Sequence, residues 1–263
     1  MSIPNTLGVS PVRAFADNYI WLIDAPAAPG RVIAVDPGDA QPVATEIERR
    51  GASLAAILLT HHHPDHIGGV AQLLRRESVP VYGPADPRIE VPIRAVGEGE
   101  RCELSHLGLS FEILHVPGHT VSHIAFHGHG ALFCGDTLFS AGCGRMFEGT
   151  PTQMSASLNR LAELPASTRM YCGHEYTAAN LRFAQEVEPH NRDAAAYAAE
   201  VERLRERDEP SLPSTLGLER RVNPFLRCEE PAVAAAAAAH AGRALAGPTE
   251  VYAELRAWKD RFR

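Results

Sequence analysis

The chain has 263 residues, of which 45% are hydrophobic and 22% charged, so it can bury a sizeable core as one domain or two small ones. This composition excludes a disordered chain. The 25 Lys and Arg residues against 32 Asp and Glu residues give a formal net charge of -7. That charge argues against nucleic acid or a polybasic membrane contact as the main function, and leaves only a local basic patch to bind an anion.

The five cysteines stand singly, with no Cys-x-x-Cys pair, so the sequence predicts neither a thiolate metal site nor a disulfide framework. The N-terminal segment MSIPNTLGVSPVRAF lacks the basic flank and apolar run of an export signal. No segment approaches the roughly 18 uninterrupted apolar residues of a membrane span. We therefore expect a soluble, cytoplasmic protein without a membrane partner. We also expect it to be a monomer.

Short apolar runs alternate with turn residues over the first part of the chain. The runs VRAF, YIWLID and RVIAV predict strands joined by hairpins over residues 9–35. A helix is expected near 41–50, followed by LAAILLT, a strand buried on both faces. Further elements of both kinds follow: a helix over 69–77, the strand VPVYG, three or four strands between 96 and 134, a helix over 152–163 and the strand RMYC. The pattern predicts a mixed α/β fold.

The composition changes after about Glu175. Ala, Glu and Arg become frequent, and apolar residues recur at helical spacing. Helices are expected near 181–187, 194–207, 232–245 and 250–262. We therefore predict two domains, one over residues 1–174 and a small all-helical one over 175–263.

A histidine cluster, THHHPDHIGG, directly follows the predicted strand LAAILLT. Alternate residues of extended backbone point the same way, so His61 and His63 can bind one metal ion together. A turn at Pro64 then lets Asp65 and His66 face a second ion. Imidazole and carboxylate ligands without thiolate favour zinc, iron or manganese, and do not choose between them.

Three further polar residues also come just after predicted strands. They are His119 in VPGHT, Asp136 in GDTLF and His174 in CGHEY. Together with the histidine cluster they supply enough ligands for a binuclear centre. Asp136 has two oxygens and can bridge ions held ~3.5 to 4 Å apart, as in two-metal hydrolases.

The cluster resembles the His-x-His-x-Asp-His signature of the metallo-β-lactamase superfamily. The match to one of its families is closer and covers essentially the whole chain. The segments DNYIWLI, THHHPDHIGG, PGHT, GDTLF, GCGRMFEGT and YCGHEYT, followed by NPFLR and RAWKD, resemble the hydroxyacylglutathione hydrolases, or glyoxalase II. Ser122 stands where this family usually has glycine, and Phe147 where some members have tyrosine; neither change touches a metal ligand.

The resemblance implies a four-layered αββα sandwich and two divalent metal ions, with zinc expected and iron or manganese as alternatives. It implies a first ion held by His61, His63, His119 and Asp136, and a second held by Asp65, His66, Asp136 and His174. Asp136, Asp65 and His66 are then the expected catalytic residues. It further implies that the glutathione part of a substrate is bound by Arg145, Tyr176, Arg256 and Lys259.

The expected reaction is hydrolysis of S-lactoylglutathione, or of a related 2-hydroxyacyl thioester, to glutathione and a 2-hydroxy acid, the second step of methylglyoxal detoxification. One alternative is a persulfide dioxygenase with a single iron, which shares much of the first ligand cluster. A non-catalytic metal-binding module is a second alternative. Hydrolysis of β-lactams or RNA is disfavoured because the tail resembles glutathione-binding helices.

Overall fold

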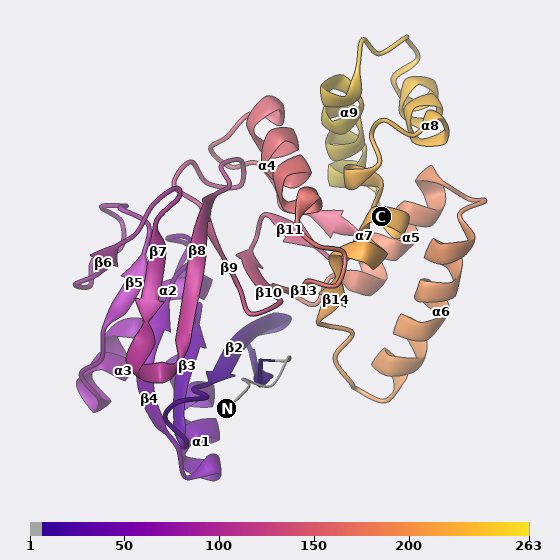
Figure 1. Ribbon diagram of the computed structural model, residues 1–263. Helices are drawn as coiled ribbons and strands as arrows, with labels where there is room; N and C mark the ends of the chain where they lie inside the picture. Colours follow the sequence, from indigo (N-terminus) through magenta and orange to yellow (C-terminus); the bar gives the residue numbers. More distant parts are fainter. Residues whose placement is uncertain (1–6, 263) are drawn as a thin grey trace. The chain divides into compact units, whose positions relative to one another are not determined.

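The computed structural model describes residues 7–262, which divide into two compact units (Figure 1). The first unit runs to His115 and includes Ser122–Gly135. The second unit comprises Val116–Val121 and the chain from Asp136 onward. This division reflects contacts in space, and the sequence domains 1–174 and 175–263 remain a prediction.

The first unit contains a six-stranded sheet whose strands follow one another in chain order. Its strands are β1 (Val9–Ala14), β2 (Asn18–Asp24), β3 (Arg31–Val35), β4 (Ser53–Leu58), β5 (Val81–Gly83) and β6 (Arg94–Ala95). The first three pair antiparallel, as the predicted hairpins require, and β3 to β6 pair parallel. The run LAAILLT therefore forms an interior parallel strand, which explains why it is apolar throughout.

Helices of the first unit pack on this sheet (Figure 1). They are α1 (Ala40–Arg50), α2 (Pro64–Ile67) and α3 (Val70–Arg76). The side chain of Asp39 caps α1 by accepting from the backbone N–H of Gln41, and Gly51 ends the helix with a φ of 59°. Both longer helices bury their apolar face in one core cluster with side chains of the sheet.

A second group of strands in the first unit forms an antiparallel meander. Its members are β7 (Arg101–Leu104), β8 (Leu109–His115), β9 (Ile124–Gly128) and β10 (Ala131–Gly135), with a short 3-10 turn at Ser105–Leu107. The turns fall at the glycines between the apolar runs, as expected. The mixed strands and helices confirm the predicted α/β class.

The second unit is mostly helical. It contains β11 (Leu138–Phe139), β12 (Gly142–Cys143), α4 (Pro151–Glu163), β13 (Arg169–Cys172), α5 (Thr177–Val187), α6 (Arg192–Glu206), β14 (Ser214–Thr215), α7 (Leu216–Val222), a 3-10 turn (Pro224–Leu226), α8 (Pro231–Ala241) and α9 (Pro248–Arg261). The four expected C-terminal helices are present. The short strand β14, which pairs antiparallel with β13, and the short helix α7 were not expected. These two elements are too short to show a periodic pattern.

Aromatic rings join the C-terminal helices. Phe183 of α5 lies 5.9 Å from Phe225 and 5.4 Å from Trp258 of α9, measured between ring centroids. Tyr252 of α9 lies 5.9 Å from Phe225. This ring cluster fixes α9 against α5, and α9 carries two of the residues expected to bind substrate.

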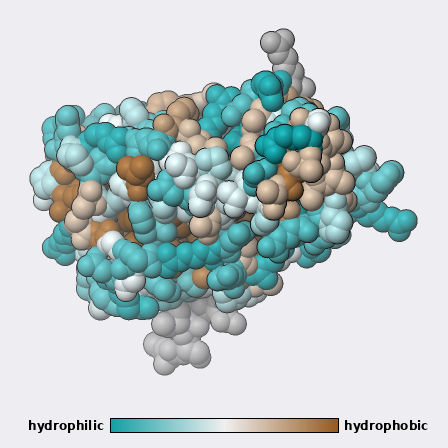
Figure 2. Space-filling view, turned by 90° about the horizontal axis from the view of Figure 1, so that it is seen from above, coloured by the Kyte–Doolittle hydropathy of each residue, from teal (hydrophilic) through white to brown (hydrophobic). Residues whose placement is uncertain are grey.

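The surface shown in Figure 2 is mostly hydrophilic, with apolar residues in small patches between polar ones. Among the described residues, three large apolar side chains are exposed: Phe15, Val121 and Phe147. None of the helices formed by residues 7–262 is both long and apolar enough to cross a membrane.

Candidate functional site

The first unit holds four of the seven expected metal ligands directly after β4. His61 and His66 are buried, and His63 and Asp65 are partly buried. Pro64 occupies the first position of α2, a place that suits proline because its missing N–H is not needed there. The predicted turn at Pro64 is thus the start of a short helix.

Asp36, just after β3, orients two of these histidines. It accepts hydrogen bonds from the backbone N–H of Thr60 (2.8 Å) and from the Thr60 hydroxyl (2.7 Å). Its Oδ2 also accepts from Nδ1 of His66 at 3.0 Å. Because the Thr60 hydroxyl donates to Asp36, it accepts from Nδ1 of His61, 3.0 Å away. Both rings therefore carry their proton on Nδ1 and present Nε2 as the ligand nitrogen.

The ligand atoms of the first unit lie close together in two pairs. Nε2 of His61 is 3.1 Å from Nδ1 of His63. Nε2 of His66 is 3.5 Å from Oδ2 of Asp65, which accepts from the amide of Asn18 at 3.0 Å. Potential ligand atoms at these distances are close enough to share a cation.

Other histidines of the first unit support the loop. The ring of His123 stacks on that of His61, with centroids 4.6 Å apart and an interplanar angle of 16°. Nδ1 of His62 lies 3.4 Å from Oδ2 of Asp86, a buried carboxylate that also accepts from Ser122 and Arg88. The Arg88 guanidinium holds the pKa of Asp86 well below its usual range. An ionised Asp86 thus holds the middle histidine of the loop.

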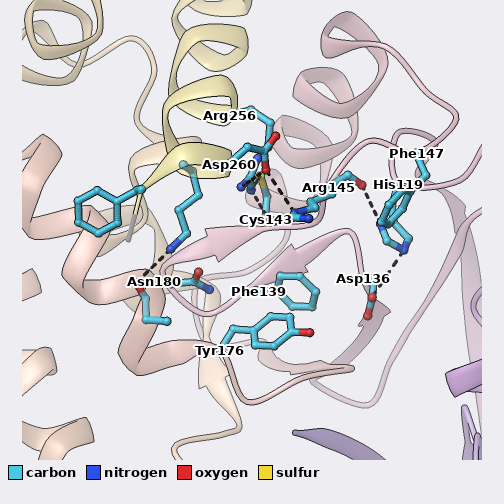
Figure 3. Close-up of a pocket in the computed structure, with 13 residues that line it drawn as sticks. His119, Asp136, Phe139, Cys143, Arg145, Phe147, Tyr176, Asn180, Arg256 and Asp260 are labelled. Carbon is cyan, nitrogen blue, oxygen red and sulfur yellow. Dashed lines mark hydrogen bonds and ion pairs between the residues drawn. The ribbon is translucent and has the colours of Figure 1, made fainter. Parts of the chain in front are cut away.

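The second unit holds the other three expected ligands. Oδ2 of Asp136 lies 3.5 Å from Nε2 of His119 and 3.2 Å from Nε2 of His174. Nδ1 of His119 donates to the backbone carbonyl of Arg145 at 2.7 Å, so its Nε2 is the ligand nitrogen (Figure 3). All three side chains are buried. The carboxylate of Asp136 therefore lies between two imidazoles, the placement expected of a bridging ligand.

A pocket of about 520 Å³ in the second unit opens from His119 and Asp136 (Figure 3). All four residues expected to bind substrate line it: Arg145, Tyr176, Arg256 and Lys259. Tyr176 stacks on His174 with centroids 4.7 Å apart and nearly parallel rings. Phe139 and Phe147 are among the apolar residues of the wall. Two of the expected metal ligands and three cationic side chains therefore line the same pocket.

The two cations of α9 have different surroundings. Arg256 is 5% exposed, and its guanidinium donates to the carbonyl of Cys143 (3.0 Å) and to Asp260 (2.9 Å). Asp260 also pairs with Arg145 at 3.3 Å, so one carboxylate holds two arginines of the pocket. Lys259 donates to the carbonyl of Ala179 at 3.1 Å. Arg256 thus stabilises the wall of the pocket through its hydrogen bonds and also contributes a positive charge.

Electrostatics set Lys259 apart. Burial, and then the neighbouring guanidinium groups led by Arg256, lower its pKa from the ordinary lysine value to about 8. A bound anion would relieve this repulsion and favour the charged ammonium. Lys259 therefore loses its charge near pH 8, and its role in binding an anion stays a prediction.

The cysteines do not supply a nucleophile. All five are buried, and none forms a disulfide within residues 7–262. Cys143 lines the pocket, but burial raises the pKa of its thiol. A thiol with a raised pKa is a poor nucleophile.

Sequence reasoning missed several residues that the site uses. Asp36 follows the strand RVIAV, the same strand-end context that identified the other ligands, and this signal could have found it. Asn18 lies in the segment DNYIWLI, and Asp260 directly follows Lys259. Asn18 contacts Asp65 and Asp260 pairs with Arg145, which are both distant in the sequence, so spacing alone does not reveal these contacts.

The donor set fits divalent transition-metal ions. Five imidazoles and two carboxylates, most of them buried, form two groups of closely spaced nitrogen and oxygen atoms. Within the first unit, Asp36, His61 and His66 also bring one ligand atom each within 4.8 Å of one another. Imidazole and carboxylate ligands of this kind suit zinc, iron or manganese.

Two family models match the chain. The one described as metallo-beta-lactamase superfamily matches residues 15–90 and 84–174, and the one described as hydroxyacylglutathione hydrolase C-terminus matches residues 175–262. A hydroxyacylglutathione hydrolase of Pseudomonas fluorescens is 53% identical over 255 residues, which cover 97% of this chain and 99% of the relative. The same enzyme of Nitrosomonas europaea is 47% identical over 257 residues, covering 98% and 97%.

Solved structures share the fold. The crystal structure of TTHA1623 in a di-iron-bound form is 30% identical, with a TM-score of 0.60, and covers 82% of this chain and 100% of that one. ETHE1 from Myxococcus xanthus has a TM-score of 0.63 at 22% identity, covering 96% and 98%, and shows the fold alone. The family models cover both parts of the sequence, and the relatives match nearly its full length. The chain therefore belongs to the hydroxyacylglutathione hydrolase family of the metallo-β-lactamase superfamily.

Proposed function

We propose that the chain hydrolyses the thioester of S-(2-hydroxyacyl)glutathione, with S-lactoylglutathione as the substrate. The observation that carries this proposal is the pocket of the second unit, which His119 and Asp136 line together with Arg145, Arg256 and Lys259. Glutathione carries two carboxylates remote from its sulfur, so cations away from the reacting bond suit it. Curated relatives with this activity in their name support the proposal.

We further propose that both ligand groups belong to one binuclear centre. The first ion would be held by His61, His63, His119 and Asp136, and the second by Asp65, His66, Asp136 and His174. Zinc is the proposed metal, with iron or manganese as alternatives, since the ligands suit all three. When bound, divalent ions supply Lewis acidity for the thioester carbonyl and lower the pKa of a water molecule.

Residues of the chain itself orient the imidazole rings. Asp36, Thr60 and the carbonyl of Arg145 fix the proton of each ring they contact on Nδ1, which keeps Nε2 available. In the overall reaction water adds its hydroxyl to the acyl carbon, the carbon–sulfur bond breaks and the sulfur takes the proton. A thiol with a pKa of about 8.5 leaves readily as thiolate, so no acid side chain is required.

The cations of the pocket serve binding. Arg145, Arg256 and Lys259 make contacts that are the same in the bound substrate and in the transition state, so they mainly lower KM. Tyr176 would hold the peptide part of the substrate beside His174. Asp136, Asp65 and His66 are the proposed catalytic residues because they would hold the metal ions that supply the Lewis acidity.

The sequence domains 1–174 and 175–263 are also part of the proposal. The bounds of the two family models, at 174 and 175, support them. We propose that the chain acts as a monomer in the cytoplasm, where five buried thiols stay reduced. The net charge of -7 supports the absence of nucleic-acid and membrane partners.

A parallel assay tests the function. Metal-loaded protein is given S-lactoylglutathione, a small thioester without the peptide, glutathione persulfide with oxygen, and a β-lactam. We expect rapid hydrolysis of S-lactoylglutathione and a much lower kcat/KM for the small thioester. Oxygen consumption with the persulfide and no thioester hydrolysis would instead identify a dioxygenase. Metal binding without any of these activities would indicate a non-catalytic metal-binding module.

A further inference from the structure

The turn between β11 and β12 is buried. Leu138 pairs with Cys143 and Phe139 with Gly142, which leaves Ser140 and Ala141 as the two turn residues. Ser140 is 1% exposed and Ala141 is 0% exposed. Turns normally lie at the surface, because their backbone N–H and C=O groups need partners. Ala141 also has a φ of 54°, which is unfavourable for a residue with a Cβ. This turn therefore requires partners from elsewhere in the chain.

Glu219 of α7 supplies the acceptors. The Ser140 hydroxyl donates to its Oε1 and the backbone N–H of Ala141 donates to its Oε2, both at 2.7 Å. The hydroxyl of Ser214 and the amide of Asn223 donate to the same carboxylate. Glu219 is fully buried. Burial raises the pKa of Glu219, but four donors match an ionised carboxylate, which only accepts.

Two asparagines supply the donors. The amide of Asn223 donates to the carbonyls of Phe139 (3.2 Å) and Gly142 (2.9 Å). The amide of Asn180 on α5 donates to the carbonyl of Ser140 at 3.0 Å. A Cβ on Gly142 would lie 2.4 Å from this amide, so a larger residue there would displace it. We call Asn180, Glu219 and Asn223 the turn clasp.

The turn held by this clasp leads directly into the pocket. Phe139, Cys143 and Arg145 all line the pocket (Figure 3). The carbonyl of Cys143 accepts from Arg256, and the carbonyl of Arg145 accepts from His119. A displacement of the turn would therefore move the two arginines that carry the pocket's permanent positive charge.

We propose that Glu219 is a positioning residue for substrate binding, which acts through the Ser140–Ala141 turn to hold Arg145 and Arg256 in place. This inference rests on the proposed function, because the ligand it positions them for is the glutathione part of the substrate. Glu219 is not among the residues that line the pocket. Glu219 instead determines the positions of the cationic side chains of the pocket.

The test is Glu219→Gln in the full-length, metal-loaded protein. The amide keeps the shape of the carboxylate but places an NH₂ group against the donors of Ser140 or Ala141. We expect KM for S-lactoylglutathione and the Kd for glutathione, measured by calorimetry, to rise about tenfold. Turnover of the small thioester without the peptide stays within about threefold of wild type, and so does kcat for S-lactoylglutathione. Glu202→Gln, on the exposed face of α6, loses the same charge and is the matched control.

Ser140→Ala gives a milder second variant, in case Glu219→Gln does not fold. It removes the hydroxyl that donates to Glu219 and that also contacts the Tyr197 hydroxyl at 3.0 Å. We expect the same pattern, with KM raised roughly threefold. Wild-type KM and Kd in the folded variants would overturn the proposal, and so would equal losses with both thioesters. A wild-type chain that does not hydrolyse S-lactoylglutathione overturns the proposed function itself, whereas wild-type turnover with unchanged variants overturns this inference alone.

Discussion

Three buried histidines of the site have Nδ1 fixed by the protein. His61 donates to Thr60, His66 to Asp36 and His119 to the carbonyl of Arg145. Neutral imidazole is the form that binds a metal, and a fixed proton on one nitrogen leaves the other as the ligand. Asp36 controls two of these rings at once, because its second contact is the Thr60 hydroxyl. A single carboxylate thus determines the state of two ligands.

Asp36→Asn should weaken metal binding. The amide oxygen of this variant can still accept one hydrogen bond, but its NH₂ group faces a donor from Thr60 or His66. We expect metal affinity to fall roughly 10- to 100-fold, measured by elemental analysis after dialysis against a competing chelator. Asp193→Asn, which removes an exposed carboxylate paired with Arg221, should retain its metal. Equal retention by both variants would contradict the role of Asp36.

Lys259 predicts a pH dependence of binding. Its pKa of about 8 means that it is charged below this pH and neutral above it, so KM should be constant below pH 8 and rise above it. Loss of one charge-assisted contact predicts that KM rises roughly fivefold or more. Steady-state kinetics on both sides of pH 8 measure this. The variant Lys259→Arg stays charged, so KM should no longer rise above pH 8. The same variant controls for ionisation of the substrate. A rise in KM of the same size in this variant would mean that another group causes the pH dependence.

Helix α9 combines packing and binding on one face. Tyr252 and Leu255 are buried in the helical core, while Arg256 and Lys259 line the pocket. Both cations also lie over aromatic rings, Arg256 over Phe225 at 5.3 Å and Lys259 over Phe183 at 5.4 Å. The rings hold the side chains so that little rotamer entropy remains to be lost on binding.

Periodicity predicted most elements correctly, because apolar spacing reports which face a helix or strand buries. The helix expected at 41–50 is α1, and the run RMYC is β13. Strand β14 was missed, because its two residues pair with β13 through partners more than 40 positions away. The contact of Arg256 with the carbonyl of Cys143 was missed for the same reason. The residue types of the site could be read from motifs, but which groups orient them depends on tertiary contacts.

Changing both Arg256 and Lys259 to Ala should raise KM for S-lactoylglutathione by about tenfold or more, with kcat changed far less. The physical reason is that remote carboxylates contribute binding in ground state and transition state alike. Because Arg256 is buried and hydrogen-bonded, its loss should also cost about 1.5 to 3 kcal/mol of unfolding free energy. Lys259→Ala alone should raise KM with a smaller fall in Tm. An unchanged KM, or an equal loss with the small thioester, would make the pair a folding element only.

At the scale of the whole molecule, the cationic side chains of the pocket contrast with the negative net charge of the chain. The chain has a net charge of -7, yet one pocket gathers Arg145, Arg256 and Lys259. An anionic substrate is repelled by the distant field, which salt screens beyond about 10 Å, and attracted by the local cations. The cations are therefore effective because they are clustered at one pocket, where Arg256 is buried and Arg145 is exposed.

The expected metal ligands lie between residues 61 and 174, with four in one unit and three in the other. Seven ligand side chains are more than one tetrahedral ion can use, so metal-replete protein should contain about two equivalents. Elemental analysis measures this metal content, and thioester turnover is measured on the same protein. Removal of the metal by a chelator should abolish the activity, and added zinc should restore it. Asp136→Ala should lower the content of both ions, because Asp136 lies between His119 and His174. Full activity at one equivalent would show that the second ion is not needed. Two tightly held ions in Asp136→Ala would show that this carboxylate is not a bridge.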